Sequence, residues 1–362
     1  MSNFIHFGCW NNLNKGCLLN VTKLLKDRLK DAAKPKIDFL TIAGDNYYPK
    51  KEKVGVKKNK IIIPSLLEEG FAHLPKEIPI YMILGNHDLE TNTGGNNFFI
   101  TDLNTSEDKA VKKDVCSIIE YEQQSKNNNE DIEYNLFKEM MLENGTLIIM
   151  IDTSMYSVDA YKYLPCYKKF LSTGSDYSVD ELKTKQLELI KTAITKYKDD
   201  VKNLILIGHH PIIGLKEKDN KNANIQDIIE FDTVLKEIYS ILSDDVTYFY
   251  LCADVHLYQE GEIGLKIDDK STMKIKQYIV GTGGTDLDKC PNKSEMAGVT
   301  RNERLTYTMT RCEAKCGFLE YINTSPVPEF LFNGVPTAGG KRKRRKTRKT
   351  KFKKSKRKSK RH

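Results

Sequence analysis

Four short segments of the sequence gather residue types that bind metal ions. They are Gly44-Asp45-Asn46-Tyr47-Tyr48, Gly85-Asn86-His87-Asp88, Gly208-His209-His210-Pro211 and Ala253-Asp254-Val255-His256. Imidazoles and carboxylate or amide oxygens are hard or borderline ligands, and adjacent glycines let the backbone approach an ion or a phosphate closely. Two cations about 3.5–4 Å apart can activate hydroxide and neutralise a phosphoryl group. The pattern therefore predicts hydrolysis of a phosphate ester.

Each segment directly follows an apolar run that is typical of a buried strand, and amphipathic stretches lie between these runs. The clearest helix begins at Ser178, whose hydroxyl can form a capping box with Glu181, and weaker helices are expected at Val21–Ala32 and Asp227–Leu242. Alternating strands and helices predict an α/β fold with functional groups at the carboxyl ends of strands. The expected strands are Phe4–Phe7, Phe39–Ala43, Ile80–Leu84, Leu147–Ile151, Leu204–Ile207 and Tyr248–Cys252.

Residues 91–135 are polar and rich in Gly and Asn, so they are expected to form a long insertion or surface loop. A later group of runs predicts strands that complete the domain. These runs are Gln259–Lys266, Lys274–Val280, Leu305–Arg311, Phe318–Asn323 and Glu329–Phe332.

The ordered motifs resemble those of the purple acid phosphatases, especially the small tartrate-resistant type, within the calcineurin-like metallophosphoesterases. The resemblance spans about residues 3–334: Phe4–Trp10 is similar to the first strand and its GDWG loop, Gly44–Tyr48 to GDNxY, and Gly85–Asp88 to GNHD. Gly208-His209 is similar to the GH-x-P loop. The resemblance implies a four-layer α/β/β/α sandwich of two mixed sheets flanked by helices.

The resemblance also implies a set of metal ligands. Asp45 would bridge two metals, Tyr48 and His256 would bind the first, and Asn86 and His209 would bind the second. A tyrosine in GDNxY distinguishes the purple acid phosphatase branch, so the resemblance implies ferric iron in the first site and iron or zinc in the second. Manganese is a further candidate.

His87 would lie beside the bound phosphate, where it could donate a hydrogen bond or the proton of the leaving group. His210 is a second candidate catalytic residue. Two ligand positions depart from the pattern: Cys9 replaces the Asp of the first loop, and Asp254 replaces the first His of GHxH. A thiolate and a carboxylate can both bind metal, so both residues stay candidate ligands.

These departures leave two functions open. The first is a metal-dependent phosphoesterase acting on phosphomonoesters through an activated hydroxide at an altered but working dinuclear site. The second is a catalytically decayed scaffold that binds partners or nucleic acid. In that case Cys9 would be a small buried apolar residue, and Asp254 would only hydrogen-bond its loop.

The end of the sequence is strongly basic. Residues 341–362 contain 16 Lys and Arg residues and no acidic residue, whereas the rest of the chain has 42 basic and 49 acidic residues. We therefore predict a phosphoesterase domain at 1–334 and a disordered Lys/Arg-rich tail at 335–362. The tail could bind nucleic acid or another polyanion, direct nuclear import, contact an anionic membrane, or simply aid solubility.

The remaining composition predicts an intracellular protein of the cytoplasm or nucleus. The sequence has no apolar run long enough to span a membrane, and Met1 is followed almost at once by a predicted strand rather than a signal peptide. Tails of this kind after a Gly-Gly hinge resemble those of large DNA viruses, which suggests a virus-encoded protein. The eight cysteines are scattered, so most are expected to be reduced, including Cys312 and Cys316.

Overall fold

The computed structural model describes most of the expected domain, and residues 337–362 of the predicted basic tail lie outside the described residues. The described residues are 2–13, 16–54, 57–90, 96–100, 110–111, 116, 132–170, 177–225, 228–292, 299–301, 304–324 and 327–336.

One mixed sheet has six strands in the order β20-β19-β1-β2-β5-β8. Strands β1, β2, β5 and β8 run parallel, and β19 and β20 extend the β1 edge in antiparallel pairing. Consecutive parallel strands bring the loops at their carboxyl ends to the same edge of the sheet. The strands are β1 Phe4–Phe7, β2 Phe39–Ala43, β5 Ile80–Ile83, β8 Ile132–Tyr134, β19 Gly317–Ile322 and β20 Glu329–Gly334.

The second mixed sheet has eight strands in the order β17-β18-β15-β16-β14-β11-β10-β9. Its centre, β10-β11-β14-β16, is parallel, and the flanking pairs are antiparallel. The strands are β9 Phe137–Met141, β10 Thr146–Ile151, β11 Asn203–Ile207, β14 Thr247–Cys252, β15 Tyr258–Lys266, β16 Thr272–Val280, β17 Val299–Arg301 and β18 Leu305–Glu313.

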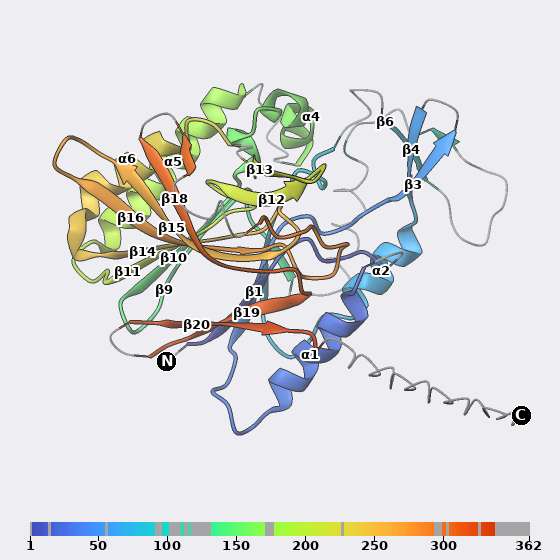
Figure 1. The fold of residues 1–362 in the computed structure, drawn as a ribbon, viewed down its shortest axis with the longest axis horizontal. Helices are drawn as coiled ribbons and strands as arrows, with labels where there is room; N and C mark the ends of the chain where they lie inside the picture. The colour runs from blue at the N-terminus through green and yellow to red at the C-terminus, as the bar shows by residue number, and fades with distance from the viewer. Residues whose placement is uncertain are drawn as a thin grey trace, which may run out of the picture.

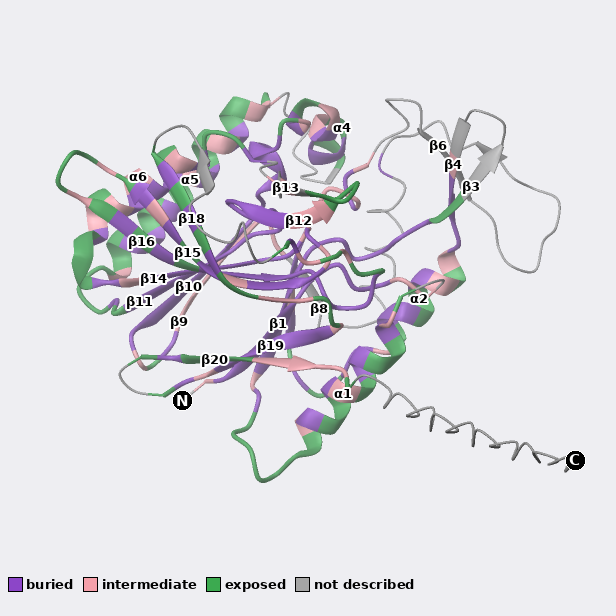
Figure 2. Cartoon of the chain, viewed as in Figure 1, coloured by how far each residue is buried: buried purple, intermediate pink, exposed green. Residues whose placement is uncertain are grey.

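The two sheets pack face to face, and helices cover their outer faces (Figure 1). Side chains alternate along β10: Ile148 and Met150 join the core shared with the six-stranded sheet, while Leu147 and Ile149 pack toward α5 and α6. Central strands are therefore buried on both faces (Figure 2). This arrangement confirms the predicted four-layer sandwich of two mixed sheets. The helical segments are α1 Leu18–Lys30, α2 Pro64–Ala72, α4 Ala160–Phe170, α5 Val179–Tyr197, α6 Phe231–Leu242, η1 Ser154–Tyr156 and η2 Ser243–Asp245.

Helix α5 begins as the sequence predicts. Ser178 Oγ accepts a hydrogen bond from the backbone of Glu181, and the Glu181 side chain accepts one from the backbone of Ser178. This capping box satisfies amide groups that the first turn leaves without helical partners. No helix among the described residues is long and apolar enough to cross a membrane.

A separate sheet lies beyond α2 in the order β3-β4-β6-β7 (Figure 1). Its strands are β3 Lys50–Val54, β4 Lys57–Ile62, β6 Asn96–Ile100 and β7 Ala110–Val111, and we call it the insertion sheet. The expected loop at 91–135 thus contains strands β6, β7 and β8 among its described residues. A hairpin, β12 Gly214–Lys218 with β13 Lys221–Ile225, follows the third motif loop.

The cysteine prediction is wrong for most of the eight residues. Three disulfides join cysteines that are 299, 50 and 22 residues apart, and only Cys9 and Cys252 are free thiols. Cys312 and Cys316, expected to be thiols, pair with different distant partners. The fold brings these side chains together, so their spacing in the sequence carried no signal. The three bonds are Cys17–Cys316, Cys116–Cys166 and Cys290–Cys312.

Candidate metal centre

Three candidate ligands occupy the first turn after a strand in the same unusual backbone conformation. Cys9 after β1, Asp45 after β2 and Asp254 after β14 have φ values of 53°, 53° and 58°. This left-handed region is unfavourable for residues with a side chain and recurs at functional sites. Before Asp45, Gly44 has φ 76°, and a Cβ there would lie 2.5 Å from the backbone nitrogen of Gly85. The strained turns thus place two motif loops in close contact.

One group of candidate ligands surrounds Oδ2 of Asp45. The ligand atoms of Cys9, Asp45 and His256 lie within 4.8 Å of one another. The Tyr48 hydroxyl lies 2.8 Å from Asp45 Oδ2 and 3.2 Å from His256 Nε2, and Cys9 Sγ lies 3.8 Å from the same Asp45 oxygen. This group contains the residues that the sequence assigns to the first metal.

A second group lies on the other side of Asp45. His209 Nε2 is 3.4 Å from Asp45 Oδ1, 3.0 Å from Asn86 Oδ1 and 3.7 Å from Asp254 Oδ1. Ligand atoms of His209, His210 and Asp254 also lie within 4.8 Å of one another. The two Asp45 oxygens therefore face different ligand groups, an arrangement in which this carboxylate could bridge two cations.

The electrostatic environment of the two ligand groups favours the binding of cations. Burial raises the pKa of the Cys9 thiol, and the Asp45 carboxylate raises it further. A bound cation reverses this effect because it stabilises the thiolate. Burial disfavours a charged Asp45, but His209 and His87 outweigh it and hold the pKa of that carboxyl well below its usual range. Asp45 therefore stays ionised and can offer its oxygens to cations.

Hydrogen bonds to residues outside the ligand groups hold three of the histidines. His209 Nδ1 lies 2.6 Å from the Ala43 carbonyl oxygen, which can only accept, so Nδ1 carries a proton and Nε2 is the ring nitrogen turned to the second group. His210 Nδ1 lies 3.1 Å from Thr153 Oγ1, and burial together with His209 lowers its pKa well below the usual range. His256 is held at its backbone nitrogen by Asp288 Oδ2, 3.1 Å away.

His87 lies beside the two groups at the wall of an open cleft. Its backbone nitrogen donates to Asp45 Oδ1 at 3.0 Å, and its ring packs against Tyr48 with centroids 5.1 Å apart. Burial lowers its pKa, but Asp45 and Glu90 outweigh that effect and raise the pKa to about 9. The cleft has a volume of about 480 Å³ and is lined by Asn12, Tyr48, Pro49, Lys50, Lys51, His87, His256, Thr285 and Asp286.

The structure brings all nine candidate site residues to one edge, where the carboxyl ends of β1, β2, β5, β11 and β14 meet. The Gly-rich segment 282–285 buttresses this edge: Gly283 donates to the Gly8 carbonyl and Thr285 to the Cys9 carbonyl. It therefore acts as a turn that supports the first motif loop. The sequence reasoning missed the orienting residues Thr153 and Asp288, and it missed Glu90, which lies three residues after His87.

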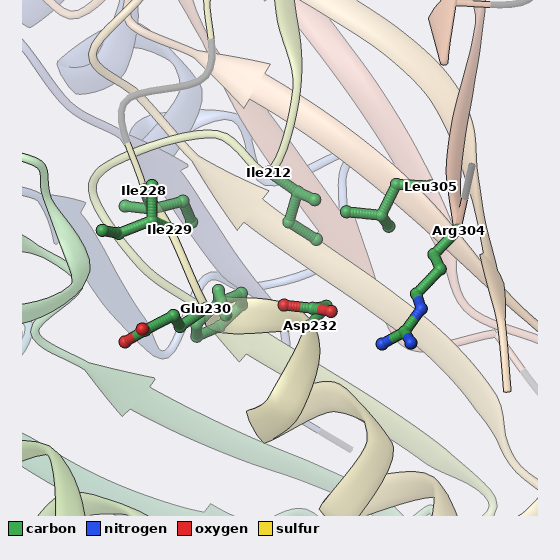
Figure 3. Close-up of a pocket in the computed structure, with 8 residues that line it drawn as sticks. Ile212, Ile228, Ile229, Glu230, Asp232, Arg304 and Leu305 are labelled. Carbon is green, nitrogen blue, oxygen red and sulfur yellow. The ribbon is translucent and has the colours of Figure 1, made fainter. Parts of the chain in front are cut away.

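A second cavity of about 310 Å³ lies where α6 begins, close to the third motif loop (Figure 3). Ile212, Ile228 and Leu305 form apolar walls, and the Asp232 and Arg304 side chains extend toward the same space. None of the candidate metal ligands lines this cavity. The chemistry predicted from the motifs therefore belongs to the cleft beside His87.

Comparison with solved structures gives similar folds at low sequence identity. GAP50, described as the anchor in the inner membrane complex of Plasmodium, is 15% identical with a TM-score of 0.50, and the match covers 92% of this chain and 84% of that one. PhoD is 12% identical (TM-score 0.49; 91% and 68% covered). A dimetal phosphatase from Danio rerio is 10% identical (TM-score 0.46; 92% and 96% covered).

Comparison of the sequence with family models identifies the family. No curated protein sequence matches this chain. A family model described as calcineurin-like phosphoesterase matches residues 2–258, which is more than two thirds of the chain. All the motif loops described above fall within that match. The chain therefore belongs to the calcineurin-like phosphoesterase family.

Proposed function

We propose that this protein is a dinuclear metal-dependent phosphomonoesterase of the purple acid phosphatase type. The observation that carries the proposal is that the two oxygens of Asp45 face separate ligand groups. Calcineurin-like phosphoesterases use a dinuclear metal site, and two bound cations would activate water and neutralise the phosphoryl oxygens. Cys9, Tyr48 and His256 would hold the first cation together with Asp45.

Asn86, His209 and Asp254 would complete the second site. Tyr48 favours ferric iron in the first site, with iron or zinc in the second and manganese as a further candidate. His87 reaches the cleft and would hydrogen-bond the phosphate or protonate the leaving group. His210, held by Thr153 behind His209, would orient the second site.

The proposal predicts near two metal ions per chain and hydrolysis of aryl phosphates that is lost on chelation. Elemental mass spectrometry of the purified protein gives the metal content, and the release of 4-nitrophenol across pH gives the rate. Activity should return when the removed metals are added back, because the ligand groups lie on rigid strand ends.

The Cys9→Asp/Asp254→His variant distinguishes an adapted site from a decayed one. An active parent that gains little from the double change supports the adapted site. A metal-free, inactive parent that becomes active after the change contradicts the proposal and favours the decayed scaffold. The fold alone does not distinguish an enzyme from a binding scaffold, because GAP50, whose structure is similar, is described as an anchor.

The basic tail supports a separate proposal. The chain would consist of a phosphoesterase domain at 1–334 and a tail at 335–362, and residues 341–362 of the tail would bind nucleic acid or another polyanion. Counterion release makes such binding strongly salt-dependent. Removal of residues 341–362 should abolish salt-sensitive binding of a DNA duplex in a fluorescence anisotropy titration and leave hydrolysis unchanged. Tight DNA binding by the truncated chain would contradict this division of roles.

The compartment and the virus-encoded origin stay proposals as well. Three disulfides are typical of proteins that mature in an oxidising environment. They favour such a compartment over the cytoplasm or nucleus that the composition predicted.

A further inference from the structure

A chain of ionic side chains runs from the insertion sheet to the candidate active site. Lys60, near the end of β4, pairs with Glu90 Oε2, and Glu90 Oε1 lies 2.9 Å from His87 Nδ1. The side chains of Lys60, Glu90 and His87 are only 9%, 16% and 21% exposed. None of the candidate metal ligands belongs to this chain of contacts.

We propose that Glu90, held in place by Lys60, is a positioning residue that aims His87 at the leaving group of the substrate. This inference rests on the proposed phosphoesterase function. It extends that function by assigning a role to the insertion sheet, because Lys60 reaches the active site from β4.

The geometry leaves His87 little freedom. Glu90 Oε1 lies within ion-pair distance of Nδ1, although the contact lacks the geometry of a regular hydrogen bond, and the nearby negative charge favours a proton on Nδ1. The ring packs against Tyr48, and its backbone nitrogen is tied to Asp45. With Nδ1 turned to Glu90, the ring nitrogen available to the cleft is Nε2.

Lys60 stabilises the charged form of Glu90 in its buried position. Burying a carboxylate is unfavourable unless it is paired. Burial raises the pKa of Glu90, but His87 and Lys60 outweigh it and lower the pKa, so Glu90 stays charged. Glu90 therefore contacts a cation with each oxygen, and loss of either contact would loosen the other.

The arrangement assists the transfer of a proton from His87 to the leaving group. As the bond between phosphorus and the leaving oxygen breaks, its electron pair stays on that oxygen, and the proton on Nε2 of His87 moves to it. The attacking water supplies the new oxygen on phosphorus, and one of its protons restores His87. The Nδ1 proton stays beside Glu90 throughout.

The test compares two substrates in the Glu90→Gln variant of the full chain. Phenolate is a poor leaving group and needs the proton, whereas 4-nitrophenolate leaves readily without it. We expect kcat for phenyl phosphate to fall roughly 10²-fold. For 4-nitrophenyl phosphate we expect a fall of less than about threefold, with both KM values nearly unchanged. Lys60→Met should act in the same direction, and Lys60→Arg should preserve the parent's kinetics.

A matched control is Glu69→Gln, because Glu69 also pairs with a histidine, His73, at 3.9 Å but is 58% exposed. It should leave both rates unchanged. Equal falls of kcat for both substrates in Glu90→Gln would overturn the positioning role, since a merely structural defect does not distinguish leaving groups. Unchanged rates for both substrates would also overturn it.

A second readout separates this inference from the proposed function. If the parent hydrolyses neither substrate, the phosphoesterase proposal fails, and nitrogen NMR of the His87 ring still tests the geometry. When the ring is neutral, we expect its one proton on Nδ1 in the parent and a partial shift of that proton to Nε2 in Glu90→Gln. A neutral His87 in the parent with its proton on Nε2 alone would refute the positioning by Glu90.

Discussion

An Asp45→Asn variant is expected to lose both bound metal ions and at least roughly 10³-fold of the hydrolytic rate, equivalent to about 4 kcal/mol of transition-state stabilisation. Asp45 contacts both ligand groups, through Oδ2 to Tyr48 and through Oδ1 to His209. An amide oxygen cannot supply the negative charge that two cations share. Metal content and kcat/KM measured on the same preparation check the result.

The control for this variant is Asp269→Asn, which removes an exposed carboxylate that pairs only with Lys266 at 2.8 Å among the contacts described. It should keep the metal content and rate of the parent. An Asp45→Asn protein with two metals and full activity would exclude Asp45 as the bridge. A folded, metal-free Asp45→Asn protein with parental activity would exclude the dinuclear mechanism altogether.

The second prediction concerns the stability of the fold, which depends on a buried ion pair between α1 and β19. Arg28 Nε donates to Glu320 Oε1 at 2.8 Å, and the two side chains are only 4% and 2% exposed. Arg28 also donates to the Pro35 carbonyl at 2.6 Å. Glu320→Ala should lower the free energy of unfolding by about 3–5 kcal/mol, because it leaves a guanidinium charge buried without its partner. Denaturant unfolding with the disulfides intact measures the loss.

A double variant separates the ion pair from the space it fills. Arg28→Met/Glu320→Leu should recover much of the lost stability, because no unpaired charge remains. The matched control is the Arg311–Glu313 pair, whose side chains are 47% and 23% exposed, and Glu313→Ala should cost less than about 1 kcal/mol. A loss below 1 kcal/mol for Glu320→Ala would show that solvent reaches Arg28.

The sequence predicted the central strands closely because they are buried on both faces. Phe4–Phe7 and Phe39–Ala43 match β1 and β2, and the capping box at Ser178 marks the start of α5. The insertion sheet was not recognised because β3 and β4 are lysine-rich and lack an alternating apolar pattern. Helix α4 was missed because it contains Pro165, which normally argues against a helix interior.

The metal centre was predictable to the extent that each ligand lies in a short motif at the end of a parallel strand. Topology then brings those loops together, as it does for Asp45 and His209, which are far apart in the chain. The contact between Lys60 and Glu90 was not predictable, because it depends on how the insertion sheet packs against the motif loop. The disulfides were missed for the same reason: only the folded chain places their sulfur atoms within bonding distance.

The bond between Cys17 and Cys316 has a consequence for how the protein is made. Because the partners are 299 residues apart, a ribosome adding about 5–20 residues per second delivers Cys316 roughly 15–60 seconds after Cys17. During that interval Cys17 can pair only with cysteines that are not its native partner, among them Cys9 of the metal centre. Correct maturation therefore requires either a delay of oxidation until synthesis passes β19 or an isomerase that releases early mispaired bonds.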